Sequence, residues 1–419
     1  MRAVSILAAL ALLCTVAGPL RRDLPSWAWS WWLLAGLWAL AGGLHRHGLR
    51  LPGFIMPAVV CPMLACAIDA AMSIWHGGGW VILRQDIKVL LGLVVAWVLM
   101  GAAQETAGKH VEQSGMMSSG HQLRQAVLWA IGLQMLVALA VALQWPRKWL
   151  PDTPIPWATA VALSMAVLAP LALGRLTGQH FSAAWRVGLG LAVAAGAAAV
   201  LLSRSRAAWV VLPWLGLLGV MSSTRKGLAL AAVLGVGAAG LGAGLWYDHL
   251  QPVQVERGLR LLDLLHEVSK WSEPDARTSV GSRLLLWEAA WNSLWAHPWT
   301  GIGITERIAL VQQVVPPETM PEVLPLVHVH QQFLNQAVDH GVPGLVASLL
   351  CAAAPFAMAW KALPGVMRWQ CLGVGVVHVC GLMFNANMTH GTYAASYALA
   401  LMAVLWTNAH ALAGRGGHD

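Results

Sequence analysis

The residues best suited to chemistry lie late in the chain, where a polar stretch leads into an apolar run. His328, His330 and Gln331 open this stretch, and Asp339 follows nine residues after His330. An ordinary histidine has a pKa near 6.5 and can accept a proton at neutral pH. Ionisable groups at the mouth of a membrane helix are costly, so they are usually functional. Asp339 lies about two and a half helical turns beyond His330, so we expect it to orient a neighbour rather than His330 itself.

The composition of the chain indicates that most of it lies within a lipid bilayer. Of the 419 residues, 58% are hydrophobic and only 11% are charged, whereas soluble domains carry about 25% charged residues. This excludes a cytosolic enzyme, a disordered chain and a secreted disulfide scaffold. The net charge of +8 comes from basic residues spread along the chain rather than gathered in one patch, so we expect no nucleic-acid partner.

Apolar runs long enough to cross about 30 Å of hydrocarbon predict an all-α integral membrane protein with about twelve transmembrane helices. The first run resembles a signal peptide, but its apolar stretch is longer than usual, so we expect a retained anchor. The expected spans are 3–20, 26–44, 53–74, 88–103, 125–143, 156–173, 187–202, 207–221, 228–246, 342–360, 369–384 and 393–411.

The short loops carry modestly more Lys and Arg on one side, which places both termini in the cytoplasm. The long segment 247–341 then faces outward, and it holds most of the 18 acidic residues. Within it, the pattern over 253–270 predicts an amphipathic helix on the membrane surface. We expect Ser282 to cap a second helix that ends at His297, before a turn at 301–303. The predicted division is 1–246 for helices 1–9, 247–341 for the outer loop with active-site elements, and 342–419 for helices 10–12 and a cytoplasmic tail.

Three short motifs lie at 203–206, 283–303 and 330–344, and together they resemble those of the O-antigen ligase superfamily. The first runs from His330 to Gly344: a histidine with a polar neighbour, an apolar anchor, an acid nine residues on, and Gly-Val-Pro-Gly. Gln331 and Asp339 stand where the family often has Asn and Glu, and both keep the chemical type. The motif lies at the outer mouth of the tenth expected span.

The other two motifs contain arginines. Ser203-Arg204-Ser205-Arg206 resembles the Ser-Arg element at the outer end of a mid-chain helix. Arg283 with Trp287, Pro298 and Gly301-Ile302-Gly303 resembles the Arg-x-x-x-Trp…Pro…Gly-x-Gly element of the loop. The resemblance covers roughly 200–345.

The resemblance implies a GT-C-like glycosyltransferase that takes a glycan from undecaprenyl pyrophosphate on the periplasmic face of the bacterial inner membrane. Negative charge grows on the leaving pyrophosphate, and a guanidinium can neutralise it because it is permanently charged and grips phosphate through two hydrogen bonds. We expect Arg206 and Arg283 to be catalytic in this sense, and Arg204 and Arg260 to help bind the donor. Arg257 is held in reserve.

His330 is then the candidate base for the hydroxyl of the acceptor sugar, with His328, Gln331 and Asp339 in supporting roles. Direct displacement would invert the anomeric configuration. We expect no cofactor and no metal, because hard cations prefer carboxylates and the expected outer loops contain no Asp-x-Asp. His328 and His330 remain a possible pair of metal ligands.

The acceptor distinguishes three activities within the superfamily. A ligase joins the glycan to lipid A-core, a polymerase joins repeat units, and an oligosaccharyltransferase modifies protein hydroxyls. The single large outer loop favours the ligase, whose partners would be the lipid-linked donor, the lipid A-core acceptor and membrane lipids. A transporter is the alternative from another class, but the polar residues gather at one mouth rather than at two symmetric sites. Asp69, inside the third span, faces either a polar partner or the path of the donor lipid.

Overall fold

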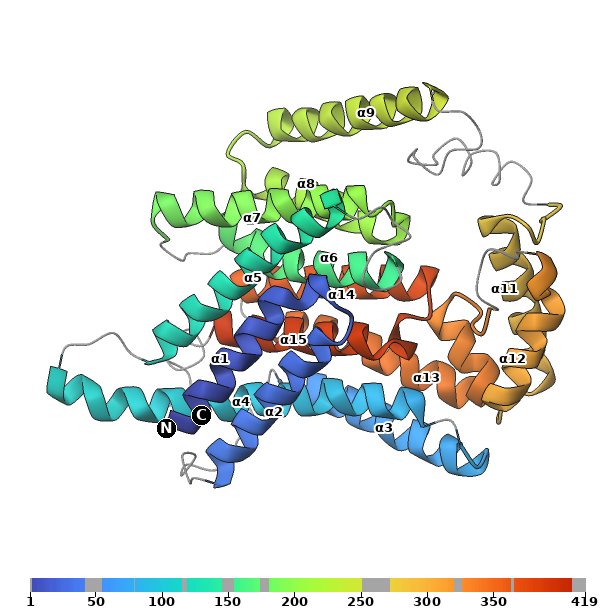
Figure 1. Cartoon of the computed structure of the whole chain (residues 1–419), viewed down its shortest axis with the longest axis horizontal. Coiled ribbons are helices and arrows are strands. Elements are labelled where there is room, and N and C mark those ends of the chain that lie inside the picture. Colours follow the sequence, from blue (N-terminus) through green and yellow to red (C-terminus); the bar gives the residue numbers. More distant parts are fainter. Residues whose placement is uncertain are drawn as a thin grey trace.

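The computed structural model describes residues 2–41, 55–78, 80–114, 119–144, 154–173, 181–250, 272–319, 326–362 and 365–408. All the regular elements in these ranges are helices, which confirms the all-α prediction (Figure 1). The α-helices of the first half are α1 (Arg2–Ala17), α2 (Leu24–Ala41), α3 (Met56–Trp75), α4 (Val81–Ser114), α5 (Ser119–Gln144), α6 (Pro154–Ala172) and α7 (Ala183–Leu202). Those of the second half are α8 (Val211–Ser222), α9 (Lys226–Leu250), α11 (Ser279–Ala296), α12 (Gly303–Val314), α13 (Gln332–Lys361), α14 (Val366–Phe384) and α15 (Gly391–Thr407).

Seven described helices are long and apolar enough to cross a membrane: α1, α3, α5, α6, α7, α13 and α14. The chain is therefore a multi-pass membrane protein. A helix lies at each of the twelve expected apolar runs, but those at Arg206–Ser222, Lys226–Gly240 and Gly391–Thr407 are shorter. The number of spans stays a prediction.

The core of the bundle is built around α6, which is packed against α7, α14 and α15. Small residues allow close approach, as expected for helices in lipid: a Cβ on Gly196 of α7 would collide with Met165 of α6. Large aromatic side chains fill the wider gaps. The rings of Trp32 and Trp406 lie 4.4 Å apart, between α2 and α15.

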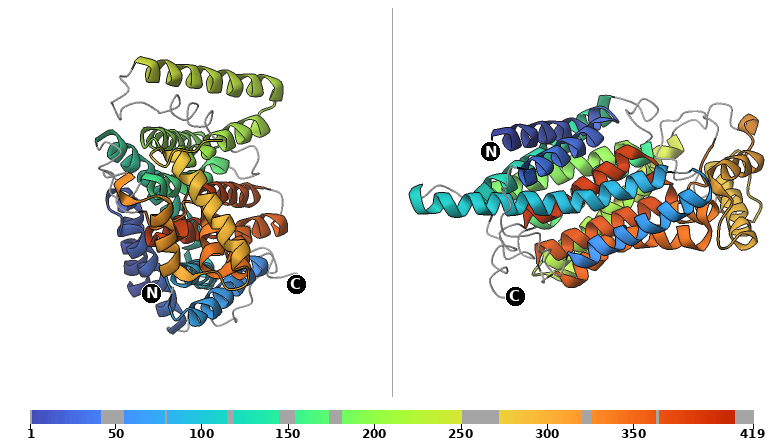
Figure 2. Two further views of the ribbon diagram at one scale, coloured as in Figure 1. Left: turned by 90° about the vertical axis from the view of Figure 1, so that its right-hand side faces the viewer. Right: turned by 90° about the horizontal axis from the view of Figure 1, so that it is seen from below.

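Hydrogen bonds between distant segments define one end of the bundle, which we call the site end. There the segments 17–22, 76–78, 154–157, 297–302 and 385–392 meet. The bonds run from the Thr392 hydroxyl to the Arg22 carbonyl (2.6 Å), from the Trp157 indole to the Pro19 carbonyl (3.1 Å) and from His76 to the Thr300 carbonyl (2.7 Å). The segments grouped here are those that the Lys/Arg pattern assigns to the outer face. Helices α11 and α12 lie across this end of the bundle (Figures 1 and 2).

Four local expectations differ in detail from the structure. Helix α13 begins ten residues before the expected span at 342, because the Gln331 side chain caps it by accepting from the Leu334 amide. The expected boundary at 341 falls at a kink inside α13, at Gly341. Helix α11 is capped by Thr278 rather than by Ser282, which is buried one turn further on. Helix α12 was not expected, since 301–303 predicts only a turn.

Candidate functional site

His330 closes a short loop, 326–331, that leads into α13. Its backbone has φ of 55°, a left-handed conformation that non-glycine residues adopt only where their surroundings impose it. The Nδ1–H donates to the Asn385 Oδ1 at 3.1 Å. The amide of Asn385 is oriented in turn, because its Nδ2 donates to Asn387 at 2.8 Å. With its proton on Nδ1, His330 keeps the lone pair of Nε2 for accepting a proton.

The charge state of His330 depends on its surroundings. Burial and then the nearby Arg283 guanidinium lower the pKa of His330 to about 4, with His390 adding to the lowering and the Asn385 hydrogen bond opposing it. The ring is therefore neutral at pH 7 and able to act as a base. Arg283 itself is partly exposed, and its Nη1 donates to the Ser279 carbonyl at 2.7 Å and to the Ser279 hydroxyl at 2.6 Å.

His328 is engaged at both ring nitrogens. Its Nδ1 accepts from the Arg307 Nη1 at 3.0 Å, so the ring proton is on Nε2, which donates to the Thr389 hydroxyl at 3.3 Å. Burial, followed by the charge of Arg307, lowers the pKa of His328 to about 3. His328 therefore supports the loop as a neutral ring, and neither nitrogen is open to a metal ion.

Asp339 lies on α13 and pairs with Arg307 of α12. The Arg307 Nε and the Asp339 Oδ1 are 2.6 Å apart, and both residues are buried, with 3% and 1% of their surfaces exposed. Asn335, one turn before Asp339, accepts from Arg307 Nη1 at 3.0 Å. The side chain that Asp339 contacts is therefore that of Arg307, while its supporting role stays a prediction. Sequence reasoning missed Arg307 because α12 itself was missed, although the interval of four residues between Asn335 and Asp339 could have suggested a cationic partner.

Two glycines join the loop element to α13. Gly301 and Gly341 both have positive φ, 65° and 66°. A Cβ on Gly301 would lie 2.5 Å from the backbone of Val338, and one on Gly341 would lie 2.4 Å from the Pro298 carbonyl. The Ile302 amide donates to Val338 and the Val342 amide donates to Pro298, at 2.8 and 2.6 Å. The Gly-x-Gly and Gly-x-Pro-Gly motifs are therefore two halves of one backbone contact.

Arg204 and Arg206 follow the C-terminus of α7. Gly196 of α7 packs against Met165 of α6, while Thr159, further towards the site end, packs against Gly381 of α14. Because α6 and α7 are consecutive and antiparallel, the end of α7 reaches the level of Thr159 and Gly381. Both arginines are partly exposed, and this placement brings them to the same end of the bundle as His330.

Two further candidates lie outside the described residues: Arg257 and Arg260, together with the expected helix 253–270. Gln331 is described, and its side chain caps α13.

A second polar cluster lies deeper in the bundle. The Gln336 amide donates to Asp69 Oδ1 at 3.3 Å, and the His340 Nδ1 lies 3.5 Å from the same oxygen. Asp86 is buried beside Asp69, and the Cys351 thiol donates to Asp86 at 3.3 Å. Asp69 therefore packs against polar partners, which is the first of the two alternatives stated for it.

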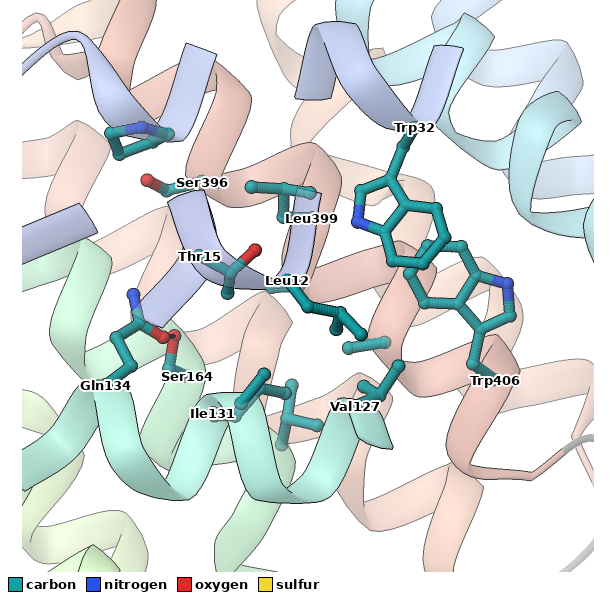
Figure 3. Close-up of a pocket in the computed structure, with 15 residues that line it drawn as sticks. Leu12, Thr15, Trp32, Val127, Ile131, Gln134, Ser164, Ser396, Leu399 and Trp406 are labelled. Atoms are coloured by element: carbon teal, nitrogen blue, oxygen red, sulfur yellow. Dashed lines mark hydrogen bonds between the residues drawn. The ribbon is translucent and has the colours of Figure 1, made fainter. Parts of the chain in front are cut away.

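The pocket in Figure 3 lies between α1, α2, α5, α6 and α15, away from these clusters. Trp32 and Trp406 close one side of it, and Ser164 donates to Gln134 at 3.1 Å on another. None of the described arginines or histidines lines this pocket. It has no cation to hold a phosphate, so we place the candidate site at the end of the bundle instead.

Residues 191–349 match the family model described as O-antigen ligase. This match confirms the resemblance that the three motifs indicated. The matched segment contains Arg204, Arg206, Arg283, Arg307, His330 and Asp339. No curated protein sequence matches the chain.

Proposed function

We propose that this chain, whose residues 191–349 carry the O-antigen ligase domain, is an O-antigen ligase of the bacterial inner membrane. It transfers O-antigen polysaccharide from undecaprenyl pyrophosphate to a sugar hydroxyl of lipid A-core on the periplasmic face. The observation that carries the proposal is His330 itself: Asn385 holds its Nδ1, which leaves Nε2 to accept a proton, and it lies in the matched segment that also contains Arg283. One group can accept a proton and the other can bind an anion.

The proposed reaction is a single displacement. The acceptor hydroxyl attacks the anomeric carbon opposite the pyrophosphate, its proton passes to His330 Nε2, and the bond from the anomeric carbon to the pyrophosphate oxygen breaks. Arg283 and Arg206 neutralise the charge that grows on the departing pyrophosphate, and Arg204 helps to bind it. No covalent enzyme intermediate is formed, so the anomeric configuration inverts.

The base works best once the donor is bound. A histidine with a pKa of about 4 is reliably neutral but weakly basic at pH 7. The pyrophosphate anion would offset the positive charge of Arg283 and raise the pKa of His330 towards its ordinary value. The arginine thus keeps the base deprotonated before binding, and donor binding strengthens it.

The test is complementation of a deletion strain, with lipopolysaccharide separated on a gel. The wild-type gene restores the polysaccharide ladder on lipid A-core. Arg206→Ala, Arg283→Ala and His330→Ala do not restore it at normal membrane levels. Arg225→Ala, Arg277→Ala and His297→Ala are matched controls at exposed positions and restore it. Full ligation by His330→Ala would remove the base assignment.

The same gel separates the related activities. A deletion strain that accumulates core bearing one repeat unit identifies a polymerase instead. Unaltered lipopolysaccharide together with lost protein glycosylation identifies an oligosaccharyltransferase.

Metal independence is tested on the purified protein. We expect the same transfer rate with and without EDTA, because the arginines supply the positive charge. A loss on chelation that Mg²⁺ reverses would contradict this.

A further inference from the structure

We infer that Arg307 is a positioning residue for His330: from α12 it holds the loop 326–331 in the shape that presents the histidine. The inference rests on the proposed function, because it assigns His330 the role of base. Arg307 is not proposed to touch either substrate.

The backbone of the loop is held at several points before His330. Arg307 Nη1 donates to the Val327 carbonyl, and the Trp287 indole donates to the Val329 carbonyl at 3.1 Å. The Val329 amide donates to Asn335 Oδ1 at 3.3 Å, the same oxygen that accepts from Arg307. Arg307 therefore takes part, directly or through Asn335, in two of these three backbone contacts. The next residue is His330 in its left-handed conformation, which needs such constraint to persist.

The Nε and Nη1 nitrogens of Arg307 bind different partners and have different roles. Asp339 balances the buried charge of Arg307 through Nε, because a buried charge without a partner is strongly unfavourable. Nη1 faces the loop, where its partners are Val327, His328 and Asn335. Charge compensation and loop holding thus use different nitrogens, so substitution can separate them.

Arg307 also determines the chemistry of His328. As a permanent donor it keeps Nδ1 of His328 an acceptor, and its charge opposes protonation of that ring. The charged or titratable groups that face His328 are Arg307, His390 and His330. Without Arg307, one cause of the low pKa of His328 is removed, so that pKa rises, while burial continues to lower it.

The experiment compares Arg307→Met, Asp339→Leu and the double variant in the full-length protein. Each single variant leaves one buried charge unpaired and is expected to lower the melting temperature. In the double variant both charges are gone, and apolar replacement of a buried ion pair commonly restores stability. We expect the double variant to melt near the wild type but to keep a kcat about 100-fold lower, with KM changed less than about 3-fold, because a misplaced base slows the chemical step. Arg186→Met, an exposed arginine on α7, is the matched control and changes none of these.

Hydrogen exchange of residues 326–331 gives a readout that does not need activity. We expect the loop amides to exchange faster in the double variant than in the wild type, with α6 unchanged. Arg307→Lys, which keeps the charge pair but lacks the fork of donors, serves if the double variant does not fold. It is expected to melt near the wild type with kcat at least 10-fold lower.

Wild-type kcat in the stable double variant, or in Arg307→Lys, would overturn the inference and leave Arg307 a structural residue. If the wild-type protein transfers nothing to lipid A-core, the proposed function fails by itself. The exchange measurement then still decides whether Arg307 holds the loop, since unchanged exchange in a stable variant would overturn that too.

Discussion

The arginines at the site end occur in two environments that differ in what surrounds the guanidinium. Arg307 is almost fully buried, and its donors go to Asp339, Asn335 and the loop backbone. Arg204, Arg206 and Arg283 are partly exposed. A guanidinium that is buried among protein acceptors on every side stabilises structure, whereas a partly exposed one can also meet a substrate anion. An arginine in the sequence is therefore not enough to identify a phosphate-binding site. The burial of its guanidinium group has to be considered as well.

Substitution of Arg283 is the strongest test of the difference between the buried and the partly exposed arginines. We expect Arg283→Ala to lower the transfer rate by about 10²–10³-fold, which is typical for losing one preorganised donor to a developing charge. The melting temperature should stay within about 2 °C of the wild type, since substitutions at partly exposed positions are usually close to neutral. Initial rates and thermal unfolding of the purified protein measure both quantities.

Arg277→Ala is the control, because Arg277 is exposed and precedes the same helix. If Arg283→Ala melts far below the wild type, Arg283 belongs with Arg307 as a structural arginine, and the comparison fails.

The backbone contact between residues 298–302 and α13 should be sensitive to a single added methyl group. Gly341→Ala forces a side chain into a left-handed position where its Cβ would lie 2.4 Å from the Pro298 carbonyl. We expect a loss of roughly 2–4 kcal/mol in the free energy of unfolding, from backbone strain and steric overlap together. Thermal or denaturant unfolding in detergent measures it.

Gly235→Ala, on α9 where a Cβ meets open space, provides the matched control and should be neutral or slightly stabilising. A neutral effect of Gly341→Ala would mean that α13 can bend without this contact.

Much of this arrangement follows from the sequence, and the remainder depends on long-range packing. Apolar runs locate the helices because the bilayer requires about twenty apolar residues for each crossing. The His330 and Arg283 motifs indicate their region because the chemistry restricts the residue types. Arg307 was missed because its helix is too short to be recognised as a membrane span and its partner lies 32 positions away. Likewise, the polar first turns of α13 resemble a loop in the sequence, whereas in the structure the Gln331 cap and contacts with α3, α11 and α12 accompany the helix there.

The tautomer of His330 is another property that pattern alone could not supply. It depends on Asn385, which sits 55 positions away at the end of α14. Nothing in the spacing of the family motif refers to that helix. The proposed base is therefore predictable as a residue type, whereas its orientation and protonation depend on the assembled bundle.

The smallest expected effect is a shift in the pH profile, which tests whether the charge of Arg283 lowers the pKa of His330. A base must be neutral, and burial with Arg283 lowers the pKa of His330 to about 4. The acidic limb of kcat/KM, which reports the free enzyme, should therefore lie near pH 4 rather than near 6.5. In Arg283→Gln one cause of the lowering is removed, so the pKa rises and the limb should move up by about one pH unit. Arg277→Gln should leave it in place. The limb of kcat should lie above that of kcat/KM in the wild type, because the bound pyrophosphate stabilises the protonated ring. If the limb of Arg283→Gln coincides with that of the wild type, the charge of Arg283 does not act on His330, and the partly exposed arginines lose their link to the proposed base.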